Sequence, residues 1–208
     1  DAHRDAWVVA LPAGERETSV ASHATVDWTA VFGRQAPLKV EIGSGTGQHA
    51  VHFAAALPHL VWQTSDRPEW LPGIRLWLAE AGLPNTPPPI ELDVRGPWPG
   101  ERFDGVFSAN TLHIMGWQEV EALFAGLPAV LADDARLTIY GPFNYASRFT
   151  SPSNAVFDAS LKADDPKRGI RDFEAVDALA QSIGFKLVED LAMPANNRCL
   201  SWRRPGKP

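Results

Sequence analysis

Cysteine is nearly absent from this chain of 208 residues, which contains only Cys199. A single cysteine cannot form a disulfide within the chain, and it excludes a zinc site built from several thiolates. Long hydrophobic runs are missing too, since no apolar stretch approaches the ~20 residues of a membrane helix. The apolar stretch 6–11 is too short for a secretory signal and is surrounded by charges. We therefore expect a cytoplasmic protein that does not associate with membranes.

Concentrations of positive charge are also lacking. Lysine and arginine total 19 against 25 acidic residues, the formal net charge is −6, and the basic residues are scattered. Proteins that bind nucleic acid usually carry a basic patch or stripe, so we expect no nucleic-acid partner. Repeats and low-complexity segments are missing as well, and the length suits one compact domain. Oligomeric state has no signature in the sequence.

From residue 38 onward, short apolar segments alternate with segments of helical periodicity. The predicted strands are 38–42, 60–64, 90–92, 105–109, 136–140, 185–191 and 199–203. The predicted helices are about 48–57, 69–81, 117–131 and 173–183. Such alternation is typical of an α/β fold in which helices cover both faces of a largely parallel sheet. The polar and aromatic segment 141–171 has no clear period.

The last two predicted strands are joined by the short segment 192–198. A parallel strand needs a crossover of a dozen or more residues, so this link predicts a hairpin and an antiparallel last strand. The pattern predicts a Rossmann-like, seven-stranded, mostly parallel sheet over residues 38–208. Residues 1–37 are expected to add a helical cap or extension, with a helix around 21–32.

A glycine-rich loop follows the first predicted strand. The residues from Glu41 to Gln48 read Glu-Ile-Gly-Ser-Gly-Thr-Gly-Gln, with glycines at 43, 45 and 47. Glycine lets a ligand approach the backbone, and loops between a strand and a helix are where α/β folds bind nucleotides. Dinucleotide folds use G-x-G-x-x-G, so this spacing argues against a nicotinamide-dependent oxidoreductase. The spacing E-x-G-x-G-x-G resembles motif I of the class I S-adenosylmethionine (SAM) methyltransferases.

Polar residues follow the next predicted strands in the order that this resemblance implies. Asp66 would accept from both ribose hydroxyls, Asp93 from the adenine amine with Val94 against the ring, and Asn110 would lie beside the methionine moiety. Each has a simpler explanation as a helix cap or turn residue. The predicted cofactor-binding set is Glu41, Gly43, Ser44, Gly45, Thr46, Gly47, His49, Asp66, Arg67, Asp93, Val94, Asn110 and Thr111.

The second half of the chain carries further motifs. They lie in the segments 107–117, 140–145, 148–158, 165–174 and 193–198. Together with Gln48-His49-Ala50, these segments resemble a family of uncharacterised SAM-dependent methyltransferases that includes methyltransferase-like protein 26. The resemblance covers residues 38–204 and implies a class I fold, SAM as cofactor and S-adenosylhomocysteine as product, but no substrate. The Arg-Asn segment usual near the start of that family is missing, and Arg16 is only a weak echo of it.

The methyl acceptor is expected beyond the fourth and fifth strands. His113 is a candidate general base, although packing is the stronger explanation for it, and Tyr140 and Asn144 are candidate catalytic groups. Substrate contacts are predicted for Tyr145, Arg148, Arg171 and Asn196. The two arginines suit a carboxylate or phosphate, or else pair with nearby acidic residues. For Asn196, a turn is the simpler role.

A metal site is not expected, because His49 and His52 have no third ligand at a suitable spacing. Trp98 is the tryptophan expected to touch a ligand or partner. The tryptophans expected in the core are Trp62, Trp70, Trp77, Trp117 and Trp202. The chain is thus predicted to be a SAM-dependent methyltransferase acting on a small molecule. The alternative is a SAM-binding sensor or partner protein without transferase activity.

Overall fold

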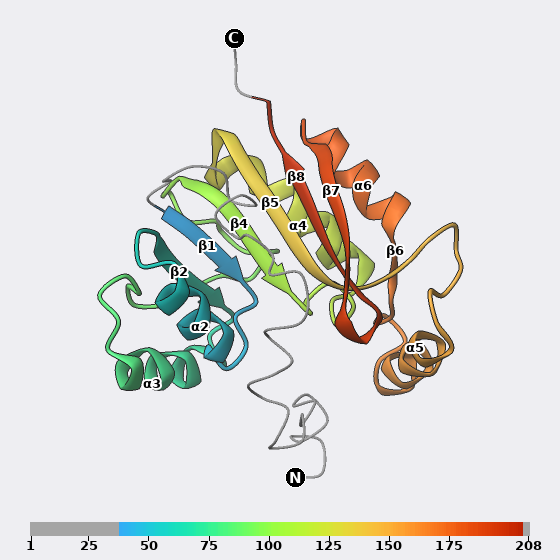
Figure 1. Cartoon of the computed structure of the whole chain (residues 1–208), viewed down its shortest axis with the longest axis horizontal. Coiled ribbons are helices and arrows are strands. Elements are labelled where there is room, and N and C mark those ends of the chain that lie inside the picture. The colour runs from blue at the N-terminus through green and yellow to red at the C-terminus, as the bar shows by residue number, and fades with distance from the viewer. Residues whose placement is uncertain (1–37, 206–208) are drawn as a thin grey trace.

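A twisted sheet organises residues 38–205, the part of the chain that this computed structural model describes (Figure 1). Its strands run in the order β3-β2-β1-β4-β5-β8-β7, and β6 pairs with the end of β5. The strands are β1 (Leu38–Ile42), β2 (Val61–Asp66), β3 (Ile90–Glu91), β4 (Phe103–Ala109), β5 (Leu131–Asn144), β6 (Arg171–Asp172), β7 (Lys186–Met193) and β8 (Asn197–Arg203). The cap predicted for residues 1–37 lies outside the described residues.

The direction of the strands confirms the predicted mixed sheet. Strands β1 to β5 are mutually parallel where they pair, and β8 runs antiparallel to both β5 and β7. The short link between β7 and β8 requires this reversal, as expected. Two details were not predicted: β5 continues to Asn144, and the two-residue β6 pairs with its last residues.

Within residues 38–205, five α-helices connect or flank the strands. They are α2 (Gln48–Ala56), α3 (Leu71–Ala81), α4 (Trp117–Val130), α5 (Pro152–Asp164) and α6 (Phe173–Ser182). Four of them lie close to their predicted positions, and α3 ends at Gly82, whose φ of 58° is left-handed. Helix α5 was missed because it buries only Asn154, Asp158 and Leu161, so it has no apolar stripe to recognise. The link between β7 and β8 contains a short 3₁₀ turn, η2 (Pro194–Asn196).

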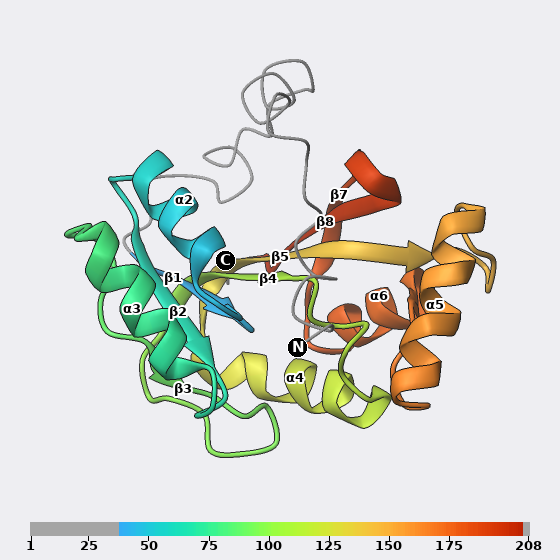
Figure 2. The same ribbon diagram turned by 90° about the horizontal axis from the view of Figure 1, so that it is seen from below.

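The helices pack against the sheet in two layers. Helices α4 and α6 cover one face, and α2 lies on the other, over β1 and β2 (Figure 2). Alternate residues of a strand face opposite sides, so Val40 and Ile42 join the layer of α4 and α6. Trp62 and Phe107 instead pack under α2. This arrangement leaves the carboxyl ends of β1, β2, β4 and β5 along one edge.

The expectations for tryptophan are met only in part. Trp62 and Trp202 are fully buried, whereas Trp70 and Trp77 are 44% and 38% exposed around α3, so the core assignment was wrong for these two. Trp98, expected to touch a ligand, packs into the main core and donates to the carbonyl oxygen of Val94 at 3.3 Å. Its indole fills the space beside Gly126 of α4.

Cys199 is buried, and burial raises the pKa of its thiol to about 12, so it remains protonated. No helix within residues 38–205 has the length and apolar character that a membrane crossing demands.

Gly126 tests the packing of Trp98. A Cβ placed at Gly126 would lie 1.9 Å from the indole Cε2, so Gly126→Ala should lower the free energy of unfolding by about 1–3 kcal/mol. The measurement is chemical denaturation. Gly100→Ala is the control, because a Cβ there meets nothing within 4 Å, and it should stay within about 0.5 kcal/mol of wild type. A Gly126→Ala variant as stable as Gly100→Ala would contradict this packing.

Candidate functional site

The carboxyl ends of the parallel strands meet at one edge, where open α/β sheets bind ligands (Figure 1). The glycine loop after β1 is fastened to the end of β2. The amides of Gly43 and Ser44 both donate to the carbonyl oxygen of Ser65, at 3.0 and 3.1 Å. The amide of Gly45 donates to Asp66 Oδ2 at 2.7 Å. The loop is therefore held in one conformation by backbone groups and by a single carboxylate.

The three glycines have different physical roles, although all have positive φ. A Cβ at Gly43 would lie 2.7 Å from Thr111 Oγ1, and one at Gly47 would lie 3.2 Å from the Cα of Ile74. These two glycines allow close internal packing. A Cβ at Gly45 would meet no atom of residues 38–205 within 4 Å. The space beside Gly45 is thus open, and it is the position in this loop where a ligand can approach the backbone.

Glu41 is buried at the end of β1, where it faces α2. Its Oε2 accepts a hydrogen bond from Trp62 Nε1 at 2.8 Å. Burial is the main cause that raises the pKa of this carboxyl from 4.5 to about 7, the Trp62 hydrogen bond opposes it, and the charge of Asp66 adds to the rise. A positively charged ligand nearby would favour the ionised form.

Asp66 and Asp93 follow β2 and β3 as predicted, but their surroundings differ. Asp66 is partly buried and accepts from the amides of Gly45 and Arg67, and burial is the main cause that raises its pKa. Asp93 accepts from the amide of Arg95 at 2.9 Å, which is the turn role that the sequence left open. Its side chain is 37% exposed and retains room for further acceptance.

The remaining predicted residues on the cofactor side are spread over the loop and the first helix. Val94 is buried in the main core, Arg67 pairs with Glu69 at 2.9 Å, and Ser44 is buried. Thr46 and His49 are exposed. No group of three potential metal ligands occurs in residues 38–205.

Beyond β4 the chain makes a tight turn that contains Asn110, Thr111 and His113. Asn110 has a φ of 55°, and its amide donates to the carbonyl oxygen of Tyr140 at 2.8 Å. Thr111 Oγ1 donates to the carbonyl oxygen of Ala109 at 2.9 Å. The ring of His113 is buried and meets Phe157 edge to face. Burial first, and then the charge of Arg171, lowers the pKa of His113 to about 4, so this imidazole is neutral at pH 7.

Gly141 of β5 lies close to two of these side chains. A Cβ on Gly141 would lie 3.7 Å from both Asn110 Oδ1 and His113 Nδ1. On the preceding residue, the Tyr140 hydroxyl accepts from Asn197 Nδ2 at 3.1 Å. Asn144, at the end of β5, is buried, and its Oδ1 has no hydrogen-bond partner.

The predicted substrate residues do not converge on this edge. The Tyr145 hydroxyl donates to Asp190 at 2.8 Å, and its ring stacks on Phe173. Arg171 donates to the carbonyl oxygens of Leu112, Met115 and Lys167, rather than to acidic side chains as the alternative supposed.

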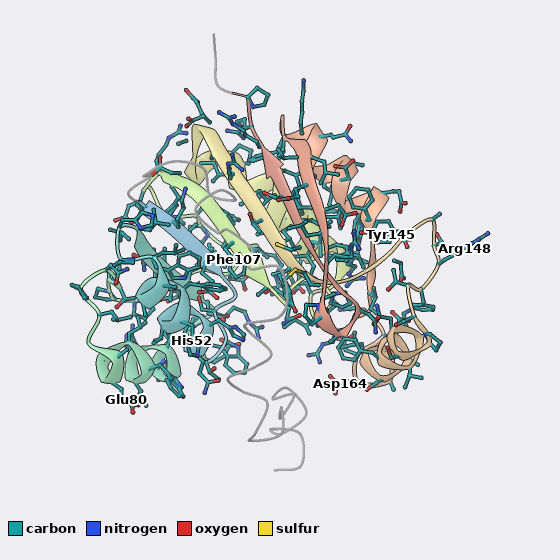
Figure 3. The ribbon with its side chains drawn as sticks, viewed as in Figure 1. His52, Glu80, Phe107, Tyr145, Arg148 and Asp164 are labelled. Atoms are coloured by element: carbon teal, nitrogen blue, oxygen red, sulfur yellow. The ribbon has the colours of Figure 1, made fainter. Side chains whose placement is uncertain are left out.

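Arg148 is exposed at the tip of the loop before α5, and its side chain points away from the molecule (Figure 3). Asn196 has left-handed φ, and its Nδ2 donates to Ser153 Oγ at 3.1 Å, which ties the β7–β8 turn to the start of α5. Its side chain thus serves the turn and its contact with α5.

Two residues of this edge were not predicted, Gly141 and Asn197. Gly141 is identified only by which side chains approach it. Asn197 reaches Tyr140 because β8 pairs antiparallel with β5, with Asn197 opposite Pro142. Asn197 belongs to the link 192–198 that was predicted to form a hairpin, and only the strand register reveals its contact with Tyr140.

Substitution of Gly45, compared with a matched control, distinguishes an effect on ligand binding from an effect of backbone strain. Gly45→Ala should lower SAM affinity at least ten-fold, because its Cβ occupies the open space beside the loop, while the free energy of unfolding falls by about 1 kcal/mol. Gly82→Ala is the matched control, since Gly82 has nearly the same φ, 58° against 57°, and equally open surroundings at the end of α3. Calorimetric titration should find SAM affinity unchanged in Gly82→Ala. Equal affinities of the two variants would exclude a ligand beside Gly45.

The carboxyl of Glu41 predicts a pH dependence of stability. Its folded pKa of about 7 lies above the ordinary value of 4.5, so the folded state holds the proton more tightly. Stability from this group is present below pH about 4.5 and is lost as the pH rises through 7. Glu41→Gln keeps an acceptor for Trp62 and removes the titration.

The free-energy advantage of Glu41→Gln over wild type should therefore grow from near zero at pH 4 to as much as about 3 kcal/mol at pH 8. Denaturation at both pH values measures this difference, and an advantage that does not change with pH would contradict the assignment.

Comparisons with solved structures identify the fold. The SAM-dependent methyltransferase SibL is 25% identical, with a TM-score of 0.71 over 84% of this chain and 52% of that one. An O-methyltransferase family protein from Burkholderia thailandensis is 16% identical, with a TM-score of 0.75 over 85% and 53%. The mitomycin 7-O-methyltransferase MmcR is 21% identical, with a TM-score of 0.72 over 82% and 49%. The fold is that of class I methyltransferases, as predicted.

Sequence relatives match a shorter part of the chain. A tRNA (guanine-N(7)-)-methyltransferase from Paenarthrobacter aurescens (strain TC1) is 48% identical over 56 residues, which are 27% of this chain and 19% of that protein. One of the same name from Arthrobacter sp. (strain FB24) is 46% identical over 56 residues, 27% and 18% of the two chains. The chain thus spans about half the length of the similar solved structures, and its match spans about a fifth of these relatives.

A protein family accounts for nearly the whole chain. The match runs over residues 22–204, which includes every strand and helix described above. The chain belongs to the family described as "Protein of unknown function (DUF938)".

Proposed function

We propose that this protein is a SAM-dependent methyltransferase that acts on a small molecule. The observation that carries the proposal is the glycine loop, where Asp66 holds the Gly45 amide and the space beside Gly45 is open. A loop of this spacing on a class I methyltransferase fold favours SAM over a dinucleotide. The resemblance to the family that includes methyltransferase-like protein 26 supports the same donor.

The residues along the edge suit the parts of this cofactor. Gly45 leaves space for the methionine portion, and Asp66 retains lone pairs for the ribose hydroxyls. Asp93 is exposed enough to accept from the adenine amine. Glu41 balances positive charge at the end of β1. When bound, SAM supplies an activated methyl group at its sulfonium.

The chain's own part in the reaction is to orient the acceptor and exclude water. The acceptor's lone pair forms a bond to the methyl carbon, and the bond from that carbon to sulfur breaks, which leaves neutral S-adenosylhomocysteine. Asn110 and Tyr140 are placed to orient an acceptor at the ends of β4 and β5. His113 is a weak base with its lowered pKa, so its role is hydrogen bonding rather than proton abstraction.

The tRNA methyltransferases among the relatives suggest a different acceptor. Their match covers about a fifth of each protein, and the net charge of −6 with scattered basic residues disfavours tRNA. The solved structures named for O-methylation, of mitomycin among others, favour small acceptors. A SAM-binding sensor without transferase activity is the remaining alternative.

Calorimetry with SAM, S-adenosylhomocysteine and NAD tests the pocket. SAM should bind and NAD should not. Asp66→Ala should weaken SAM binding at least 30-fold, because it removes the acceptor for Gly45 and for the ribose. Asp66→Asn should lie between this variant and wild type, since one amide oxygen remains.

Asp164→Ala is the control for these variants, because this exposed carboxylate of α5 pairs only with Arg168 among the described residues. It should bind SAM as wild type does. Unchanged affinity in Asp66→Ala would exclude the proposed site.

Transfer of label from methyl-labelled SAM tests the activity. Label should enter small molecules of a metabolite extract and should not enter purified tRNA. Label in tRNA alone would replace the small-molecule acceptor by RNA, and SAM binding without any labelled product would favour the sensor.

A further inference from the structure

The positive charges near the acceptor side are engaged in holding the protein together. Arg171 donates to three backbone carbonyl oxygens, and in doing so fixes the turn that carries His113. Arg198 binds Asp190, with Nη2 at 2.6 Å from Oδ1. Lys162 binds Asp158 at 2.6 Å. These three cations are bound by carbonyl oxygens or carboxylates of the protein, and none of them is positioned to bind an anionic ligand.

The other basic side chains of this region lie on its outside. Arg148 points away from the molecule (Figure 3). Arg168 pairs with Asp164, and Lys167 lies exposed beside Gly116 at the start of α4. Within the described residues, the two arginines predicted to clamp a carboxylate or phosphate therefore do not converge on the ends of β4 and β5.

Uncharged groups line the ends of β4 and β5 instead. We name the set Asn110, Tyr140 and Asn197 the amide rim. Asn110 is exposed directly after β4, and Asn197 Nδ2 donates to the hydroxyl of Tyr140 on β5. Groups of these types can bind a ligand through directed hydrogen bonds without a net charge.

The Tyr140 hydroxyl has a defined hydrogen-bonding role in this rim. Asn197 Nδ2 donates to the Tyr140 hydroxyl at 3.1 Å and to the Pro194 carbonyl oxygen at 3.3 Å, so both hydrogens of that amide are used. The hydroxyl accepts from Asn197 and retains its own hydrogen to donate. Burial raises the pKa of Tyr140 further above its ordinary value of 10, so this donor persists at neutral pH. Tyr140 is thus prepared to donate to an oxygen or nitrogen of a ligand.

We propose that the methyl acceptor is a small molecule without an anionic group, bound by the amide rim with Tyr140 as its hydrogen-bond donor. This rests on the proposed transferase function. The reacting atom is an uncharged oxygen, sulfur or nitrogen with a lone pair. Its bond to the methyl carbon forms as the carbon–sulfur bond breaks, and where it carries a proton, the proton passes to water at the exposed Asn110. The overall acidity of the chain also disfavours anions.

The test separates acceptors by charge before the reaction. A metabolite extract is passed over a strong anion exchanger at pH 7.5, and the retained and unretained fractions are each incubated with protein and methyl-labelled SAM. Label should enter the unretained fraction. Fractionation comes first because methylation of a carboxylate would hide its charge. Label confined to the retained fraction would overturn the proposal.

Two variants sharpen the result. Tyr140→Phe should lower kcat/KM for the labelled fraction about ten-fold, mainly through KM, with SAM affinity unchanged in calorimetry. If Arg148 clamped an anionic acceptor, Arg148→Gln would lose most of its activity. We expect instead that this variant changes kcat/KM less than two-fold. A ten-fold loss in Arg148→Gln, or none in Tyr140→Phe, would overturn the proposal. Bound SAM with no label in either fraction would instead refute the transferase function, and the acceptor class with it.

Discussion

The hydrogen bond from the Gly45 amide to Asp66 is the constraint on which the donor side depends. It joins the loop after β1 to the end of β2, and it adds to the two amides that share the Ser65 carbonyl oxygen. A loop with three glycines has a large conformational entropy to lose, so a charged acceptor is needed to hold it. The same carboxylate is the residue expected at the ribose. In the proposed function, one side chain would therefore carry both loop order and ligand recognition.

The two halves of this edge, at the ends of β1 and β2 and at the ends of β4 and β5, differ in their charged side chains. The donor half contains the buried Glu41 and the partly buried Asp66, and burial raises both pKa values. Two carboxyls close together are costly without a positive partner, and a sulfonium with an ammonium group supplies that partner. On the acceptor half, Arg171 and Arg198 are occupied by carbonyl oxygens and by Asp190. In the proposed function, the protein would thus keep its available negative charge for the methyl donor and use neutral groups for the acceptor.

The sequence predicted the parts of the fold that have a local or periodic cause. The mostly parallel sheet, the hairpin and four helices follow from apolar period and link length, and Gly43 to Gly47 follow from spacing. Helix α5 was missed because its buried face includes Asn154 and Asp158, which bond to partners distant in sequence. The carbonyl partners of Arg171 and the contact of Asn197 with Tyr140 were not predicted for the same reason. Their partners are set by tertiary packing, and a one-dimensional pattern carries no record of it.

Backbone strain distinguishes two turns, at 146–147 and at 195–196, from the glycine loop. Ala146, Ser147, Ala195 and Asn196 all have positive φ, which costs a residue with a Cβ about 1 kcal/mol or more each. Hydrogen bonds from these two turns offset this cost, because the Ala146 amide donates to Glu174 and the Asn196 side chain donates to Ser153 at the start of α5. Glycine would relieve the strain but leave both turns free to move. Residues that carry a side chain and adopt this conformation hold the start of α5 and the hairpin turn in fixed positions. Fixed positions would suit the proposed site, where hydrogen bonds orient an uncharged acceptor.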